Sequence, residues 1–371
     1  RVVGLFLFVV VWAAAALGEN SAAANIAPSA VYVVFWVGLT VISGVVGDLW
    51  RALSPYDTLA AVAQRVRART RVADDSKGRR EYRFGHWPAA IGLGGFTWLE
   101  LAHPDPASPR VLAVAIAAYS VAVLAGAAWW GRGWLRQGEA FAAFFGLLAA
   151  MAPVYRDEEG RLRLRPPLVG LTRLEVLPGT AALVVVALGS TSFDGLSRSA
   201  FWADVVGDRT GWAASALATL GLCWMVGLVA VLYTGATRLA ARVVSREPNA
   251  LVDVFVHSLV PIALAYAVAH YFSLLVFEGQ GAYALASDPF GWDWDLLGSA
   301  SRPINYRAVS TATIAYVQVG AIVVGHIAGV VLAHDRAVAT FRPRLATRSQ
   351  YPLLAAMVVY TVGGLVLLLG G

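Results

Sequence analysis

The sequence has little charge, one cysteine and one lysine. Only 14% of its 371 residues are charged and 58% are hydrophobic, whereas roughly a quarter of the residues of a soluble domain are charged. The single Cys223 excludes an internal disulfide and a metal cluster built from several thiolates. Gly-rich phosphate loops, His-Glu-x-x-His and Gly-x-Ser-x-Gly motifs are missing, so the common signatures of soluble enzymes do not apply.

The apolar residues are gathered in long blocks. A run of about 18 or more apolar residues crosses roughly 30 Å of hydrocarbon as a helix. The blocks do not alternate with period two, as the strands of a membrane barrel would. The sequence therefore predicts an all-α integral membrane protein, folded as a single polytopic domain over residues 1–371. We expect about nine transmembrane helices, at residues 2–17, 30–46, 88–102, 111–130, 179–193, 212–235, 251–277, 308–333 and 352–369.

The basic residues test this count and give an orientation. Short cytoplasmic loops are enriched in Lys and Arg. If Arg1 lies inside, the inner segments hold 24 of the 29 basic residues. The prediction is a multi-pass protein of the plasma membrane, with the N-terminus of this chain inside and its C-terminus outside. The net charge of +6 then comes from arginines that lie at the surface of the lipid bilayer, which is the expected partner. Nucleic acid is not expected to bind.

Several segments outside these helices have patterns of their own. Leu59–Arg71 places apolar and arginine positions at helical spacing, which predicts a helix on the inner membrane surface. Glu139–Met151 is apolar but too short to span, so we expect a re-entrant or interfacial helix. Arg161–Arg165 alternates strictly and predicts a strand or hairpin arm. Because the chain begins at Arg1 beside an apolar segment and without an initiator Met, we expect upstream residues to be missing.

Ionisable side chains at membrane depth are the candidates for a functional site, since each costs about 2.5–3.5 kcal/mol on insertion scales. His257 and His326, on the seventh and eighth predicted helices, fall at similar depth if each residue rises about 1.5 Å. Asp253 precedes His257 by four residues and shares its face, where it would hold one ring nitrogen. We predict a metal or proton site here; the alternative is histidines that serve only as hydrogen-bond partners.

A second group of candidates lies near the outer ends of the helices. His270 is close to the outer end of the seventh helix, and Glu100 and His103 end the third helix on the same side. A His–His–Glu set suits zinc, copper or non-haem iron; the alternative is ordinary interface residues. The acidic and aromatic loop 278–306 is expected to act as a lid. Asp194 is interpreted as an ordinary helix-end residue.

The histidine spacing bears on haem. His257 and His270 are 13 residues apart, so they differ by about 140° around a helix. This argues against a stack of two haems, in which both histidines of one helix face the same way. A single haem between two histidines stays an alternative to a divalent transition metal.

Several short motifs distributed along the chain together form the pattern of one protein family. They include Phe35-Trp-Val-Gly38, Gly47-Asp-Leu-Trp-Arg-Ala-Leu-Ser-Pro55, Arg83-Phe-Gly-His-Trp-Pro-Ala-Ala90, Phe96-Thr-Trp-Leu-Glu100, Gly138-Glu-Ala-Phe141, Arg165-Pro-Pro-Leu168, Thr191-Ser-Phe-Asp-Gly-Leu196, Ala269-His-Tyr-Phe272 and Ser287-Asp-Pro-Phe-Gly-Trp292. Together they resemble a family of actinobacterial-type polytopic membrane proteins labelled fenitrothion hydrolase. The resemblance covers nearly the whole chain, but the family begins further upstream, with a segment containing histidine and glycine.

The resemblance implies a membrane hydrolase of organophosphorus triesters. A metal-activated water would be the natural nucleophile, and no catalytic residue is assigned. Three functions therefore stay open. The first is a metal-assisted hydrolase with a His/carboxylate site between the seventh and eighth helices. The second is a transporter or redox subunit that handles a metal, a haem or protons. The third is a scaffold that packs against another membrane subunit.

Overall fold

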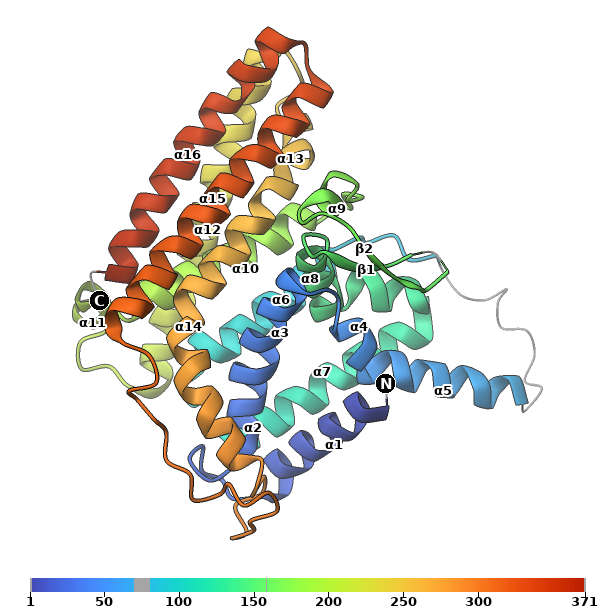
Figure 1. Ribbon diagram of the computed structural model, residues 1–371, viewed down its shortest axis with the longest axis vertical. Coiled ribbons are helices and arrows are strands. Elements are labelled where there is room, and N and C mark those ends of the chain that lie inside the picture. Colours follow the sequence, from blue (N-terminus) through green and yellow to red (C-terminus); the bar gives the residue numbers. More distant parts are fainter. Residues whose placement is uncertain (1, 70–80, 158, 370–371) are drawn as a thin grey trace.

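The structure is a computed structural model that describes residues 2–69, 81–157 and 159–369. The described chain is almost entirely helical (Figure 1). Its first half contains α1 (Val2–Leu17), α2 (Ile26–Pro28), the π-helix η1 (Ser29–Gly38), α3 (Leu39–Val45), α4 (Trp50–Leu53), α5 (Pro55–Arg69), α6 (Trp87–Leu101), α7 (Pro109–Trp130), η3 (Trp134–Gly138), α8 (Ala140–Ala149), β1 (Val154–Arg156), β2 (Leu162–Leu164) and α9 (Val169–Thr172). Its second half contains α10 (Thr180–Ser197), α11 (Ala200–Val206), α12 (Gly211–Val243), α13 (Ala250–Phe255), the 3₁₀-helix η4 (Val256–Leu259), α14 (Val260–Leu285), α15 (Thr311–Thr340) and α16 (Pro343–Leu369).

The prediction of an all-α membrane protein is confirmed in its broad form. In the described part of the chain, seven helices are long and apolar enough to cross a membrane. They are Ile26–Val45, Pro109–Trp130, Thr180–Ser197, Gly211–Val243, Ala250–Leu285, Thr311–Thr340 and Pro343–Val366. The two other predicted spans also form helices, α1 and α6, but these have only 16 and 15 residues. The count of nine therefore stays a prediction.

Several helices extend beyond the predicted ends. Arginines marked the expected inner ends of the last helices, yet α12 continues to Val243 and α15 to Thr340. The reason is that a helix keeps its backbone hydrogen bonds after it leaves the hydrocarbon. The apolar length therefore indicates where a helix crosses the membrane and not where the helix stops.

Two helices at the centre of the molecule carry the core. Within their most apolar windows, α10 is 78% buried and α13–α14 is 72% buried, compared with 17% for α15 and for α16. In Figure 1, α12, α15 and α16 lie side by side in the upper part of the molecule, with α10 and α14 adjoining the N-terminal helices. The apolar faces that α15 and α16 leave uncovered fit contact with lipid tails.

The short apolar segment predicted at Glu139–Met151 forms α8, which is buried among other helices. Ten residues are too few to span, and nearly all of α8 is covered by protein. After α7 ends, the chain turns back along it: the Trp134 indole donates to the Val123 carbonyl at 3.0 Å, and the Tyr119 hydroxyl donates to Glu139. The chain thus goes back alongside the helix that it has just left, and the choice between a re-entrant and an interfacial position stays a prediction.

Two smaller predictions have clear outcomes. The alternating arginine segment forms β2, which pairs antiparallel with β1 in a hairpin, so that prediction is confirmed. The helix expected at Leu59–Arg71 is present as α5 over Pro55–Arg69, and the last two predicted positions lie outside the described residues.

Helical geometry is irregular at η4 in the second half of the chain and at η1 in the first half. The predicted seventh helix begins as α13, tightens to 3₁₀ geometry in η4 and resumes as α14 with Pro261 in its first turn. Proline has no backbone N–H to donate, so it fits best at a helix start, where that N–H would have no partner within the helix. The break changes the faces on which residues before and after it lie. The irregularity of η1 is of the opposite kind, since its turns are π-helical and wider than those of an α-helix. Such turns are frequent near functional sites.

Gly325 is required for the close contact between α14 and α15. A Cβ added there would lie 2.2 Å from the Ala265 Cβ and 2.9 Å from the Pro261 carbonyl oxygen, and neither atom belongs to a flexible side chain. We expect Gly325→Ala to lower the free energy of unfolding in detergent by about 1–3 kcal/mol, the usual cost of overpacking. Gly320→Ala on the same helix is the matched control. No described atom lies within 4 Å of the added Cβ, so the control should be neutral or slightly stabilising.

Candidate functional site

An acid–histidine pair is buried between α10 and α14. The Nε2 atom of His270 lies 2.8 Å from Oδ2 of Asp194. The two side chains are only 10% and 6% exposed. Asp194 also forms an ion pair with Arg198, whose Nε lies 3.2 Å from Oδ1. An acidic side chain held this deeply between apolar helices needs such partners, since burying it unpaired would be costly.

The positions of Asp194, Arg198 and His270 follow from the geometry of α10 and α14. Asp194 and Arg198 are four residues apart at the end of α10, so they share one face and can pair. The Arg198 side chain is 60% exposed, so it joins the buried pair to the solvent at that end of the helix. His270 comes from the middle of α14, which packs against α10 and η1.

Glu100 and Tyr271 complete the cluster. Glu100 comes from the last turn of α6, and its Oε2 atom is buried with no hydrogen-bond partner among the described residues. Its electrostatic neighbours are Asp194 and Arg198. Tyr271 is buried on α14, and its hydroxyl is directed at Asp194 and at the indole of Trp36. We call Glu100, Asp194, His270, Tyr271 and Arg198 the acid–histidine cluster.

The charges of the acid–histidine cluster define what it can do. Two carboxylates, Glu100 and Asp194, lie beside one permanent cation, Arg198. One additional proton, carried by His270 or by a carboxyl group, balances the cluster. The arrangement therefore suits the uptake and release of a proton.

The first predicted site, His257 with His326, is not assembled in the expected way. The His326 ring packs edge-on against Tyr266, with centroids 6.0 Å apart, and its Nδ1 hydrogen-bonds the Ile322 carbonyl at 2.8 Å. Tyr266 lies nine positions after His257, a rise of roughly 13 Å. His257 instead has Arg336 and Asp335 as its charged neighbours. The depth estimate assumed one uniform helix and ignored the register in which α14 and α15 pack.

Asp253 does not hold His257. It is exposed on α13, and the nearby titratable group that it influences is Tyr233. The 3₁₀ turns of η4 lie between Asp253 and the rest of the helix, so the expected shared face is lost. Nδ1 of His257 is buried without a hydrogen-bond partner in the described part of the chain.

The second predicted group is assembled only in part. Glu100 and His270 lie in one cluster, as their common side of the membrane suggested. His103 is elsewhere: its ring contacts Trp98 and Trp212 with centroids 5.8 and 5.6 Å away, and its Nδ1 accepts from the Asp105 amide.

The loop expected to act as a lid lies against the connection between α1 and α2. The Phe290 carbonyl accepts from the Glu19 amide at 2.8 Å, and the Pro289 carbonyl accepts from the Ile26 amide at 3.2 Å. These bonds fix the loop over the ends of N-terminal helices. Its role as a lid stays a prediction.

Sequence reasoning missed Asp194, the residue at the centre of the cluster. Two signals were available: an acid inside an otherwise apolar helix, and an arginine four residues later on the same face. Trp36 and Tyr271 gave no comparable signal, since aromatic residues are common throughout membrane helices.

Comparisons of the chain with protein-family models, with curated proteins and with solved structures found no match. The resemblance to fenitrothion hydrolases therefore stays a prediction. Within residues 2–69, 81–157 and 159–369, no three or more His, Cys, Asp or Glu side chains form a group that could hold a metal ion. The predicted zinc, copper or iron has no support from this arrangement, and the single haem stays a prediction.

Proposed function

We propose that this protein is a membrane transporter that translocates protons, and that the acid–histidine cluster binds and releases the proton. The observation that carries the proposal is the buried contact of 2.8 Å between His270 and Asp194, with Glu100 as an electrostatic neighbour of Asp194. Ionisable side chains inside a membrane are expensive, and they commonly mark proton relays and ion pathways. The cluster contains an imidazole and two carboxylates, which are the groups that such relays use.

The helices around the cluster support the same class of function. Secondary transporters bind their substrates where helices are interrupted near the middle of the membrane. Here η1 is π-helical, η4 interrupts the helix that carries His270, and α8 enters the bundle without crossing it. Irregular backbone at membrane depth is tolerated where protein or a water-filled cavity surrounds it.

The proposal includes an orientation in the plasma membrane. The helix ends that the sequence predicts on the inner side of the membrane contact each other in pairs. Gly4 packs on the Leu53 backbone, and the His86 N–H donates to the Pro178 carbonyl. The arginine-rich loops follow these ends, which favours a cytoplasmic location for them. The acid–histidine cluster then lies toward the outer ends of α6 and α10.

Replacing Glu100 by Gln tests the proposal. Purified protein is reconstituted in liposomes that hold a pH-sensitive dye, and a potassium diffusion potential drives protons inward. We expect Glu100→Gln to slow luminal acidification by about tenfold or more, because the amide cannot release a proton. Its stability should be unchanged or higher, since a buried unpaired carboxyl is replaced by a neutral group. This combination of lost function and retained stability is characteristic of a functional residue.

Asp105→Asn is the control, because Asp105 is an exposed acid five residues away in the following loop. It should acidify the lumen at the wild-type rate. Equal rates for wild-type protein, Glu100→Gln and protein-free liposomes would contradict proton handling. Metal-dependent turnover of fenitrothion by wild-type protein that persists in Glu100→Gln would favour the hydrolase instead.

A further inference from the structure

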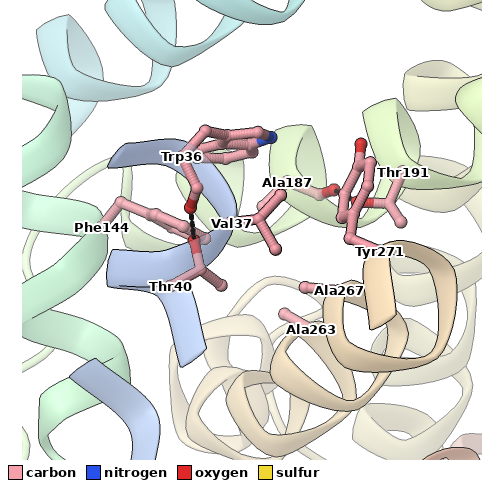
Figure 2. A pocket seen from close by; sticks show the side chains of 9 residues that line it. All are labelled: Trp36, Val37, Thr40, Phe144, Ala187, Thr191, Ala263, Ala267 and Tyr271. Carbon is pink, nitrogen blue, oxygen red and sulfur yellow. Dashed lines mark hydrogen bonds between the residues drawn. The ribbon is translucent and has the colours of Figure 1, made fainter. Parts of the chain in front are cut away.

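A small cavity lies next to the acid–histidine cluster, between η1, α3, α8, α10 and α14. Figure 2 shows Trp36 and Tyr271 on opposite sides of it, with the small side chains of Ala263 and Ala267 along one edge. The space inside is about 10 Å³, close to the minimum that one water molecule needs. A site of this size admits water and excludes a larger substrate.

The cavity has the polar partners that a bound water requires. Trp36 is only 4% exposed, and its Nε1 makes no hydrogen bond of normal geometry within the described residues, although it faces the Tyr271 hydroxyl. The hydroxyls of Thr40 and Thr191 also line the space, and each donates to its own helix backbone and keeps lone pairs free. A water here can accept from Trp36 and donate to a threonine. An internal water typically makes about three such hydrogen bonds.

The position of the cavity relates it to the cluster. Thr191 precedes Asp194 by about one turn of α10, and Ala267 precedes His270 by about one turn of α14. Both lining residues therefore lie on the inner side of the cluster in the proposed orientation. Tyr271 belongs to both sites, since it lines the cavity and its hydroxyl is directed at Asp194.

A second unpaired polar atom lies beyond the cavity in the same direction. Ser43 follows Thr40 by three residues on α3, is fully buried, and has an Oγ without a partner in the part of the chain that the structure describes. Buried hydroxyls without a protein partner are usually satisfied by ordered water. The polar positions of η1 and α3 thus continue from the cluster toward the inner end of the helix.

We propose that this cavity is a water site that relays protons between the acid–histidine cluster and the inner side of the membrane. The inference rests on the proposed function. Tyr271 passes its hydroxyl proton to the Asp194 carboxylate and takes a proton from the water. The water takes one in turn from a hydronium ion that arrives from the inner side, near Thr40 and Ser43, and that leaves as water. Each O–H bond that breaks is replaced by a new one, so only a proton moves.

Filling the cavity tests the proposal. Ala267→Leu places a larger side chain where the water would lie, and Ala216→Leu on the exposed face of α12 is the matched control. Short X-ray pulses generate hydroxyl radicals from bound water, and mass spectrometry then detects the oxidised side chains. In wild-type protein we expect labelling of the buried Trp36, with the exposed Trp292 as the positive control. Ala267→Leu should reduce the labelling of Trp36 and the rate of liposome acidification by about tenfold or more, because the water is displaced.

The outcomes separate this inference from the proposed function. Trp36 that stays unlabelled in wild-type protein while Trp292 is labelled would overturn the water site. Loss of Trp36 labelling with a wild-type acidification rate in Ala267→Leu would overturn the relay. If wild-type liposomes do not acidify although Trp36 is labelled, the proposed function fails and the water site stands. Ala216→Leu should match wild-type protein in both measurements.

Discussion

Asp194→Asn is expected to slow proton-driven acidification of liposomes by about a hundredfold, within the range of effects seen for groups that transfer protons directly. Asp194 is the only residue of the acid–histidine cluster whose carboxylate meets both His270 and Arg198. Asparagine keeps the shape of the side chain and can still accept a hydrogen bond, but it removes the negative charge that balances a proton on the imidazole. The measurement is the acidification rate of liposomes that contain folded, monodisperse protein.

Variants of His270, the partner of Asp194, test whether the two side chains act together. If Asp194 and His270 act as one unit, His270→Gln should slow acidification as much as Asp194→Asn, and the double variant should be no slower than either. Asp204→Asn, an exposed acid on α11, is the control and should behave as wild-type protein. Losses that add in the double variant would show that the two side chains act independently and would contradict a shared proton site.

The sequence was sufficient to predict the helices because a membrane span has a strong signal. Long apolar blocks and the distribution of arginines placed most helix ends within a few residues, and all nine predicted spans correspond to helices. The residues of the candidate site were harder to identify, since their contacts depend on how helices pack. His270 was predicted as a candidate metal ligand, whereas its main partner in the structure is Asp194, 76 residues away in the sequence.

Irregular helix geometry explains most of the remaining errors. The pairing of Asp253 with His257 assumed 3.6 residues per turn throughout the seventh helix, and η4 interrupts that period. The approach of His257 to His326 assumed that α14 and α15 meet at equal depth. Their actual register is set by Gly325 against Ala265, which leaves His326 beside Tyr266. No pattern in the sequence fixes such a register, because lipid-facing and protein-facing positions are equally apolar.

Glu139 was not singled out from the sequence, yet it is the most completely bonded carboxylate in the described chain. Its two oxygens accept from the backbone amides of Phe141 and Ala142 at 2.9 and 2.8 Å, from the Trp50 indole at 3.1 Å and from the Tyr119 hydroxyl. The first two bonds cap the start of α8, and the other two tie that start to α4 and α7. Glu139 therefore holds the buried helix α8 in place from its N-terminal end.

Glu139→Ala should consequently lower the free energy of unfolding in detergent by about 3–5 kcal/mol. Four donors, two buried and two partly buried, lose their acceptor at once. Each unsatisfied buried group costs roughly 1–3 kcal/mol before the structure relaxes. The effect should exceed that of Gly325→Ala, which strains one helix contact and leaves every hydrogen bond intact. A titration with denaturing detergent, followed by circular dichroism, measures the difference.

Glu81→Ala is the matched control, because Glu81 pairs with Arg83 at the surface and is 76% exposed. Surface ion pairs contribute about 0–1 kcal/mol, so this variant should be close to wild-type protein. Glu139→Gln should fall between the two, since the amide oxygen still accepts while its NH₂ group faces donors. Glu139→Ala that unfolds at the wild-type midpoint would contradict a role for this carboxylate in fixing α8. Because Phe144 of α8 lines the cavity beside Tyr271, loosening α8 should also slow acidification in whatever protein stays folded.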